Sequence, residues 1–446
     1  MSEAPPHPSA MEAAKLWAKI GFLGFGGPAG QIALMHKELV EERRWISERR
    51  FLHALNYCML LPGPEAQQLA TYIGWLLHGA RGGITAGLLF ILPGFLIILG
   101  LSSAYALFQE TDWLANLFFG LKAAVLAIVI EAVIRVGRRA LKTRFALIVA
   151  ALAFAALFFL ALPFPLVVLA AGIAGYIATR LQPETGEKAR AAALGDNPSV
   201  IDENFPQIVS SWGRTFRVLT VWLALWLAPF VLIGALAGVD NVYAAIGLFF
   251  SKMAIVTFGG AYAVLAYVAQ QAVDTYQWLK PGEMLDGLAL AETTPGPLVL
   301  VLSFVGFMGA FRAPMGLDPL AAGLLGATLA TWVTFVPCFL WIFLGAPYVE
   351  TLRNNRALAG ALSAISAAVT GVILNLALWF GLHVLFATVS RWQAGPFSMA
   401  VPEWATLDAA ALGLTLLAAY ALFRLKLGVI TTLGLCALAG FLIRLI

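Results

Sequence analysis

Long apolar stretches, separated by short polar ones, run along almost all of the 446 residues of the chain. A helix that crosses a bilayer needs roughly 20 mostly apolar residues, and about a dozen stretches approach that length. Lipid offers no hydrogen bonds to the backbone, so such stretches must satisfy their own amide groups as helices. The pattern therefore predicts an all-α polytopic membrane protein.

Composition supports this class and narrows the function. The chain is 61% hydrophobic and 12% charged, and its mean hydropathy is +0.86, whereas soluble domains are about 25% charged. The net charge of +4 is spread over loops and gives no reason to expect nucleic acid as a partner. A GxxxxGK[ST] phosphate loop is absent, and the three cysteines lie far apart. We expect no enzyme activity, no cofactor and no metal.

The chain contains an internal repeat. The first FGG motif (Phe25, Gly26, Gly27) recurs as the second FGG motif (Phe258, Gly259, Gly260), and Trp45 recurs as Trp278. The first PGP motif (Pro62, Gly63, Pro64) recurs as the second PGP motif (Pro295, Gly296, Pro297), and all these matches share one offset of 233 residues. A shared offset across glycine, proline and tryptophan is not compositional noise. We predict an N-terminal repeat at 1–181, a polar linker with one connecting transmembrane helix at 182–242, and a C-terminal repeat at 243–446.

Loop charge predicts the orientation, because basic loops face the cytoplasm. The loops 36–50 and 135–144 are both rich in Arg and Lys, yet three apolar segments lie between them. The conflict disappears if 52–78, which is interrupted by the first PGP motif, enters and leaves on one side as a re-entrant hairpin. The segment 16–35, broken at the first FGG motif, is expected to do the same. The alternative is a topology in which every segment spans.

The second repeat is then expected to be inverted. One span at 216–238 carries the chain to the outside, so the hairpins 243–269 and 284–311 enter from there, and each repeat continues with about four spanning helices. Inverted repeats with broken helices are a common plan of secondary transporters, and they hold substrate near the midplane. A helix that begins after a break presents free N–H groups and a positive dipole end, which suit an anion.

The four breaks and the polar residues beside them are the candidate substrate-binding residues. They comprise Lys19, Phe25, Gly26, Gly27, Gln31, Pro62, Gly63, Pro64, Glu65, Gln67, Gln68, Lys252, Thr257, Phe258, Gly259, Gly260, Tyr262, Glu292, Thr293, Thr294, Pro295, Gly296 and Pro297.

Charged candidates have alternative explanations. Lys19 suits either an anion site or a snorkelling position at the membrane interface, whereas Lys252 and Lys122 lie inside apolar runs, where charges usually serve function. Glu65 follows the first PGP motif, and Glu292 precedes the second. Either carboxylate could carry a coupling proton or pair with a lysine.

The stretches GFGGPAGQIALMHKELVEERRW, LLPGPEAQQLATYIGW and LALAETTPGPLVLVLSFVGF resemble the chromate ion transporter family in its long, two-domain form. AGLLFILPGF and TFGGAYAVLAYVAQQAV carry the same resemblance. It covers 11–140 and 243–345 most clearly and fades in the linker and the later spans.

The resemblance implies a secondary active transporter that exports chromate across the bacterial inner membrane by alternating access, with sulfate as a competitor or exchange partner. A passive anion channel is the alternative, and a membrane-embedded enzyme would need clustered His, Asp or Glu residues that are absent. Membrane lipid surrounds such a protein, and the sequence leaves open whether it forms a homodimer.

Overall fold

A computed structural model describes residues 5–181, 199–201, 211–258, 261–348, 356–395 and 397–445. Helices account for nearly all of its regular structure, which confirms the predicted class. Six helices are long and apolar enough to cross a membrane. They are α4 (Glu65–Phe108), α5 (Asp112–Ala140), α7 (Phe164–Leu181), α8 (Trp212–Ala237), α13 (Pro319–Gly345) and α15 (Arg356–Leu385).

The remaining elements are shorter. In the first half they are α1 (Ala10–Leu23), α2 (Gly27–His36), the π-helix η1 (Lys37–Glu42), α3 (Glu48–Cys58) and α6 (Arg144–Phe158). In the second half they are α9 (Val242–Val256), α10 (Ala261–Gln270), η2 (Gln271–Thr275), α11 (Glu283–Thr293), η3 (Leu298–Leu300), α12 (Val301–Arg312), η4 (Ala346–Tyr348), β1 (Val389–Ala394), β2 (Phe397–Pro402), η5 (Trp404–Thr406), α16 (Ala409–Phe423) and α17 (Val429–Leu445).

The same order of elements occurs in both halves. Two helices flank each FGG motif, a π-helix follows the second of them, and the next helix ends before each PGP motif. Even an unusual backbone recurs, because Arg44 and Gln277 stand 233 residues apart and both have φ of +53°. Bulky residues with positive φ are uncommon, so this match shows that the two halves share local geometry as well as sequence.

α4 consists of two helices joined at a kink. Its 44 residues would extend about 66 Å as one helix, roughly twice the hydrocarbon thickness of a bilayer. His78 and Gly79 leave helical geometry, and Gly79 has φ of +61°. At the corresponding place in the second half, α12 ends at Arg312 and α13 begins at Pro319. The part of α4 before the kink and α12 are each too short to span.

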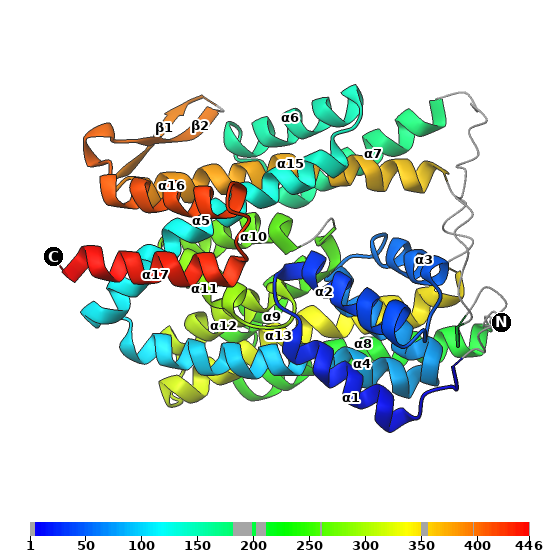
Figure 1. Cartoon of the computed structure of the whole chain (residues 1–446). Coiled ribbons are helices and arrows are strands. Elements are labelled where there is room, and N and C mark those ends of the chain that lie inside the picture. Colours follow the sequence, from blue (N-terminus) through cyan, green and yellow to red (C-terminus); the bar gives the residue numbers. More distant parts are fainter. Residues whose placement is uncertain are drawn as a thin grey trace.

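The two halves interleave rather than forming separate bodies. Figure 1 shows α6, α7, α15 and α16 along one side of the molecule and α1, α4, α8 and α13 along the other, with the short helices α2, α3, α10 and α11 between them. α4 packs on α12 and α13, and α5 packs on α15, α16 and α17. Small residues allow the closest approaches, as is usual for helices in membranes: a Cβ built on Gly120 of α5 would lie 1.8 Å from the Cys436 carbonyl oxygen of α17.

Three features differ from the predictions or add to them. The predicted loop between the spans ending near 386 and beginning near 405 contains the antiparallel hairpin β1–β2. α6, α16 and α17 have 15, 15 and 17 residues and are shorter than the spans expected there. Trp45 and Trp278 are buried, with 8% and 6% exposure, and both pack into the protein core.

Candidate substrate site

The residue just before the first FGG motif contacts the second PGP motif. α1 ends at Leu23, and the Gly24 carbonyl accepts a hydrogen bond from the Gly296 backbone N–H at 2.9 Å. The Gln31 side-chain amide donates to the carbonyl oxygens of both residues, at 3.0 Å to Gly24 and 2.5 Å to Gly296. Gln31 is fully buried. One side chain of α2 therefore fastens a break of the first repeat to a break of the second.

The other two breaks make the reciprocal contact. The Gly63 N–H donates to the Thr257 carbonyl at 2.7 Å. Gly63 and Gly296 are repeat counterparts, as are Gly24 and Thr257, each pair at the offset of 233. When residue i of one unit contacts residue j of the other and the reverse contact also exists, the interface has the form that a two-fold axis produces. The breaks of the two repeats are thus cross-paired by equivalent backbone hydrogen bonds.

Glycine is required at these breaks. Gly63 has φ of +119° and Gly296 has φ of +95°, a backbone that L side chains rarely adopt. A Cβ on Gly63 would also lie 2.8 Å from Cys338 Sγ and 2.9 Å from Gln68 Nε2. Gly26 and Gly27 have φ of +83° and +68°, yet a Cβ there would meet nothing within 4 Å. The first FGG motif therefore opens onto free space, whereas the first PGP motif is tightly packed.

Helices that start at the breaks are left uncapped by side chains. α2 begins after Gly26, α4 after Pro64 and η3 after Pro297, and none of these three has a side-chain cap. Seven other helices are capped by Ser, Thr, Asn or Asp side chains, namely α1, α3, α6, α8, α9, α13 and α16. An uncapped start leaves N–H donors free. Free donors are not confined to the breaks, because α5 and α11 also begin without a side-chain cap; the helix starts at the breaks are among those that could receive an anion.

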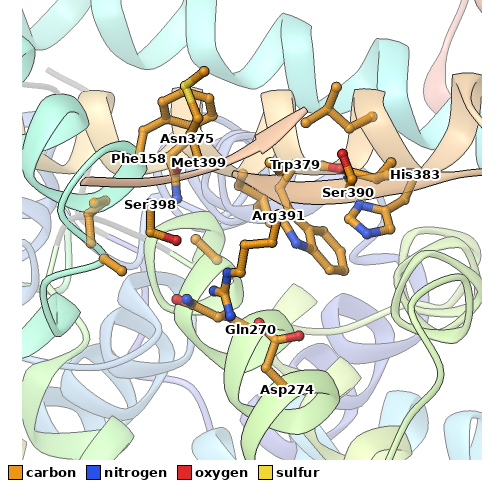
Figure 2. Close-up of a pocket in the computed structure, with 17 residues that line it drawn as sticks. Phe158, Gln270, Asp274, Asn375, Trp379, His383, Ser390, Arg391, Ser398 and Met399 are labelled. Atoms are coloured by element: carbon orange, nitrogen blue, oxygen red, sulfur yellow. Dashed lines mark hydrogen bonds between the residues drawn. The ribbon is translucent and has the colours of Figure 1, made fainter. Parts of the chain in front are cut away.

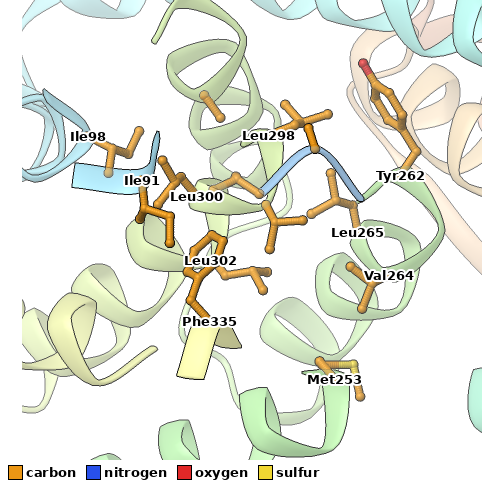
Figure 3. Packing of buried hydrophobic residues seen from close by; sticks show 14 of the residues in the cluster. Ile91, Ile98, Met253, Tyr262, Val264, Leu265, Leu298, Leu300, Leu302 and Phe335 are labelled. Carbon is orange, nitrogen blue, oxygen red and sulfur yellow. The ribbon is translucent and has the colours of Figure 1, made fainter. Parts of the chain in front are cut away.

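The amide side chains beside the breaks belong to the first repeat. Gln67 donates to Thr71 Oγ1 at 2.9 Å, and Gln68 donates to the Pro62 carbonyl at 2.7 Å. The Oε1 atoms of Gln31, Gln67 and Gln68 accept no hydrogen bond within the described part of the chain. Their repeat counterparts are apolar: Val264, Leu300 and Val301. Figure 3 shows Val264 and Leu300 inside a hydrophobic cluster with Ile91 and Leu298.

The polar residues of the second repeat are largely engaged. Tyr262 donates to Glu292 Oε1 at 2.5 Å, and both side chains are buried. The Thr257, Thr293 and Thr294 hydroxyls bond to carbonyls of their own helices. Phe258 is partly buried, and Gly259 and Gly260 lie outside the described residues.

The two repeat-related lysines differ. Lys19 is 46% exposed and pairs with Glu38 Oε1 at 2.5 Å, and Glu38 also pairs with Arg43. Burial opposes ionisation of Glu38, but the ion pairs with Lys19 and Arg43 outweigh it and lower its pKa. Lys252 is exposed on α9, and no ion pair joins it to another described residue. Among the described residues, neither ammonium makes a hydrogen bond or an ion pair with a break, in contrast to the joint approach expected from the repeat. Glu65 occupies the first turn of α4 and is partly buried.

The third lysine has a buried partner that sequence reasoning missed. Lys122 Nζ of α5 lies 3.3 Å from Asp286 Oδ1 of α11, and the Tyr105 hydroxyl of α4 donates to Asp286 Oδ2 at 2.8 Å. Asp286 is 3% exposed. Asp286 lies inside the segment 284–311, which the sequence predicts to be a membrane hairpin, so its carboxylate could have been flagged by the rarity of charges at membrane depth. Nearby, Arg312 makes a two-point ion pair with Glu283 at 2.6 and 2.8 Å.

Comparison with known proteins agrees with the resemblance in the motifs. The family model described as Chromate transporter matches residues 11–176 and 244–441. The chain is 33% identical over 384 residues to a chromate transport protein of Pseudomonas aeruginosa, covering 83% of this chain and 81% of that one. It is 29% identical over 402 residues to a probable chromate transport protein of Synechococcus elongatus, covering 87% and 92%.

A chromate transport protein of Cupriavidus metallidurans is 29% identical over 360 residues, or 80% of this chain and 78% of that one. No solved structure matches significantly. The family model covers both halves, each with its own FGG and PGP motifs, and the three relatives align over 80–87% of the chain. The chain is therefore a polytopic membrane protein that belongs to the chromate transporter family.

Proposed function

We propose that this protein is a secondary active transporter that exports chromate from the bacterial cytoplasm, with sulfate as a competitor or exchange partner. Membership of the chromate transporter family supports chromate as the substrate. The cross-pairing of Gly24 with Gly296 and of Thr257 with Gly63 is the observation that carries the mechanism. Breaks held at a two-fold interface can exchange partners when one repeat rocks against the other, which is the movement that alternating access needs.

Substrate binding is proposed at the uncapped helix starts. The free space in front of Gly26 and Gly27 would admit a tetrahedral dianion to the N–H groups of α2. Gln67 and Gln68 at the start of α4 have further hydrogen-bonding capacity. The Lys19–Glu38 and Lys122–Asp286 pairs would then hold the repeats in position rather than contact the substrate. Alternatively, movement of one repeat would release these cations toward the substrate.

The inverted topology is proposed on loop contacts. Residues 44–47, expected in the cytoplasm, form a parallel bridge with 199–201 of the linker, which is expected there too. On the expected outer side, Asp408 lies 3.4 Å from Arg444, and the Ser398 N–H donates to the Phe159 carbonyl at 2.8 Å. These pairs are those that the hairpin topology brings to one side of the membrane. In α8 the buried residue is Trp226, and the other side chains are accessible. This helix would therefore contact lipid or a second copy in a homodimer.

The experiment is uptake of labelled chromate into inverted inner-membrane vesicles, with and without a proton gradient and with added sulfate. We expect saturable uptake that collapses when the driving gradient is removed and that sulfate inhibits. Ohmic anion current that persists without the gradient would instead identify a channel. Absence of chromate flux in vesicles that contain the folded protein would overturn the proposal.

A further inference from the structure

A polar cavity lies away from the four breaks, beneath the β1–β2 hairpin. Its volume is about 230 Å³, far more than the roughly 10–15 Å³ that one water molecule requires. The end of α6 forms one wall, α10 with η2 forms another, and α15 forms the third. Figure 2 shows Arg391 reaching down from the hairpin between these walls, toward Gln270 and Asp274. The cavity therefore lies where the two repeats and the hairpin meet.

The hairpin is fastened to both repeats. It follows α15 of the second repeat, and its strands pair in register from Val389–Pro402 to Ala394–Phe397. The Ser398 N–H donates to the Phe159 carbonyl at 2.8 Å, in the connection between α6 and α7 of the first repeat. A hairpin held at both ends keeps Arg391 over the cavity. Its position also makes the cavity sensitive to any relative movement of the repeats.

The lining is rich in hydrogen-bond donors. Arg391 contributes a guanidinium, Gln270 and Asn375 contribute amides, and Ser398 contributes a hydroxyl, whereas the Ser390 hydroxyl donates to the Val401 carbonyl at 3.2 Å. His383 Nδ1 is 2.8 Å from the Trp379 carbonyl, and the two rings lie 4.2 Å apart, so the imidazole is held in place. Asp274 is the single carboxylate among the lining residues, and no ion pair within the described residues joins it to Arg391. The guanidinium thus keeps its two-point donor geometry for another acceptor.

We propose that this cavity is a second binding site for a small tetrahedral oxyanion, used on the outer side of the membrane after the substrate leaves the breaks. Arg391 is the principal ligand, and the amides and the Ser398 hydroxyl complete the hydrogen bonding. Asp274 weakens the affinity by like-charge repulsion, which favours release over retention. The choice of oxyanion and of the outer side rests on the proposed function. The cavity geometry and the donor set do not depend on it.

The test uses Trp379 as a local reporter in the purified full-length protein. Its fluorescence is isolated as the difference between the native protein and W379F, and chromate is titrated as the quencher. We expect saturable quenching in the native protein. R391Q should raise the half-saturating chromate concentration by about tenfold or more, because a charge-assisted hydrogen bond is lost. R391K should lie between the two, and D274N should lower the half-saturating concentration.

The matched control is R424Q, which removes an exposed arginine directly after α16 that does not line the cavity. It should stay within about twofold of the native protein, since no ligand contact is lost. All variants must match the native gel-filtration profile. Equal half-saturation in R391Q and R424Q, weaker binding in D274N, or no quenching of Trp379 would overturn the inference. Chromate uptake by native vesicles with no Trp379 quenching would refute only this second site, whereas quenching without transport would refute only the proposed function.

Discussion

The Gln31 side chain in α2 donates a hydrogen bond to the Gly296 carbonyl, 265 residues further along the chain. The same amide nitrogen lies 3.0 Å from the Gly24 carbonyl. These contacts join an uncapped helix of the first repeat to a glycine turn of the second. Any relative movement of the repeats must either carry this amide along or break its bonds, so Gln31 is well placed to influence both stability and transport.

Replacing Gln31 with leucine should impair the protein in both respects. The variant keeps the size of the side chain but loses two buried hydrogen bonds, which should cost about 1–3 kcal/mol of folding free energy. We expect a lower thermal midpoint in detergent and a lower chromate uptake rate. The control is Q109L at the end of α4, where the amide donates one hydrogen bond among the described residues, to the Ala106 carbonyl at 3.5 Å. A Q31L variant as stable and as active as Q109L would contradict this role.

Alanine at the PGP glycines should be harmful to different degrees. G63A and G296A each force an alanine into positive φ, at a cost of roughly 1–3 kcal/mol. G63A should be the worse of the two, since its Cβ would lie 2.8 Å from Cys338 Sγ, whereas the nearest atom to that of G296A would lie 3.3 Å away. Thermal unfolding and chromate uptake measure both.

The control for the glycine variants is G413A in α16, where a Cβ would meet nothing within 4 Å and the backbone is helical. It should be neutral or slightly stabilising. C338A should relieve part of the steric cost of G63A and leave both the backbone cost and the contact with Gln68 Nε2 at 2.9 Å. If G63A and G413A have the same thermal midpoint, the conformational requirement at Gly63 is refuted.

The Lys122–Asp286 ion pair should show strong coupling in a double-mutant cycle. Removing either partner leaves the charge of the other partner unpaired. We therefore expect K122M and D286N each to destabilise the protein by about 2–3 kcal/mol. This is less than the cost of breaking a fully buried pair, because the Lys122 side chain is 30% exposed. The double variant should cost less than the sum. K142M, at an exposed loop position, is the control. Additive effects in the cycle would show that the two side chains do not interact.

The Glu38 ion pairs predict how stability depends on pH. The pKa of Glu38 is lowered by Lys19 and Arg43, so its stabilisation is complete above the unfolded carboxyl pKa of about 4.3 and is lost as the pH falls through the folded value. E38Q should be less stable than the native protein by about 1–2 kcal/mol at neutral pH. This cost is smaller than that of breaking a buried ion pair, because Lys19 is 46% exposed and solvent screens its charge.

Thermal midpoints of the native protein and E38Q, measured across pH, provide the test. The difference between them should stay constant from neutral pH down to about pH 5 and should shrink in more acidic buffer. E110Q, which changes an exposed carboxylate that makes no ion pair with another described residue, serves as the control. A difference that grows on acidification would be inconsistent with a lowered pKa at Glu38.

Single introduced cysteines should show on which side of the membrane each end of the long second part of α4, after the kink, lies. The native cysteines Cys58, Cys338 and Cys436 are buried, so impermeant thiol reagents should report only the introduced residues. R81C, after the kink in α4, should be labelled from the cytoplasmic side, and E110C, after the end of α4, from the outer side; both positions are exposed. Labelling of R81C from the outer side would refute the hairpin topology and favour the one in which every segment spans.

The sequence by itself determined the membrane class, the repeat and the positions of the breaks. These features are local: a run of apolar residues, a glycine that permits positive φ and a proline that cannot continue a helix act within about 20 residues. The helices accordingly end at Leu23, Cys58, Val256 and Thr293, each just before an FGG or PGP motif. The shared offset of 233 also placed the two sets of breaks in correspondence.

Only the tertiary structure decided which groups meet. It brought each FGG motif next to the PGP motif of the other repeat. It also formed the Lys19–Glu38 and Lys122–Asp286 ion pairs. Arg391 came to lie over a cavity between the repeats. These partners stand between 19 and more than 200 residues apart. Their choice depends on how whole helices pack, because side-chain burial and direction are set by that packing and not by the residues on either side in the chain.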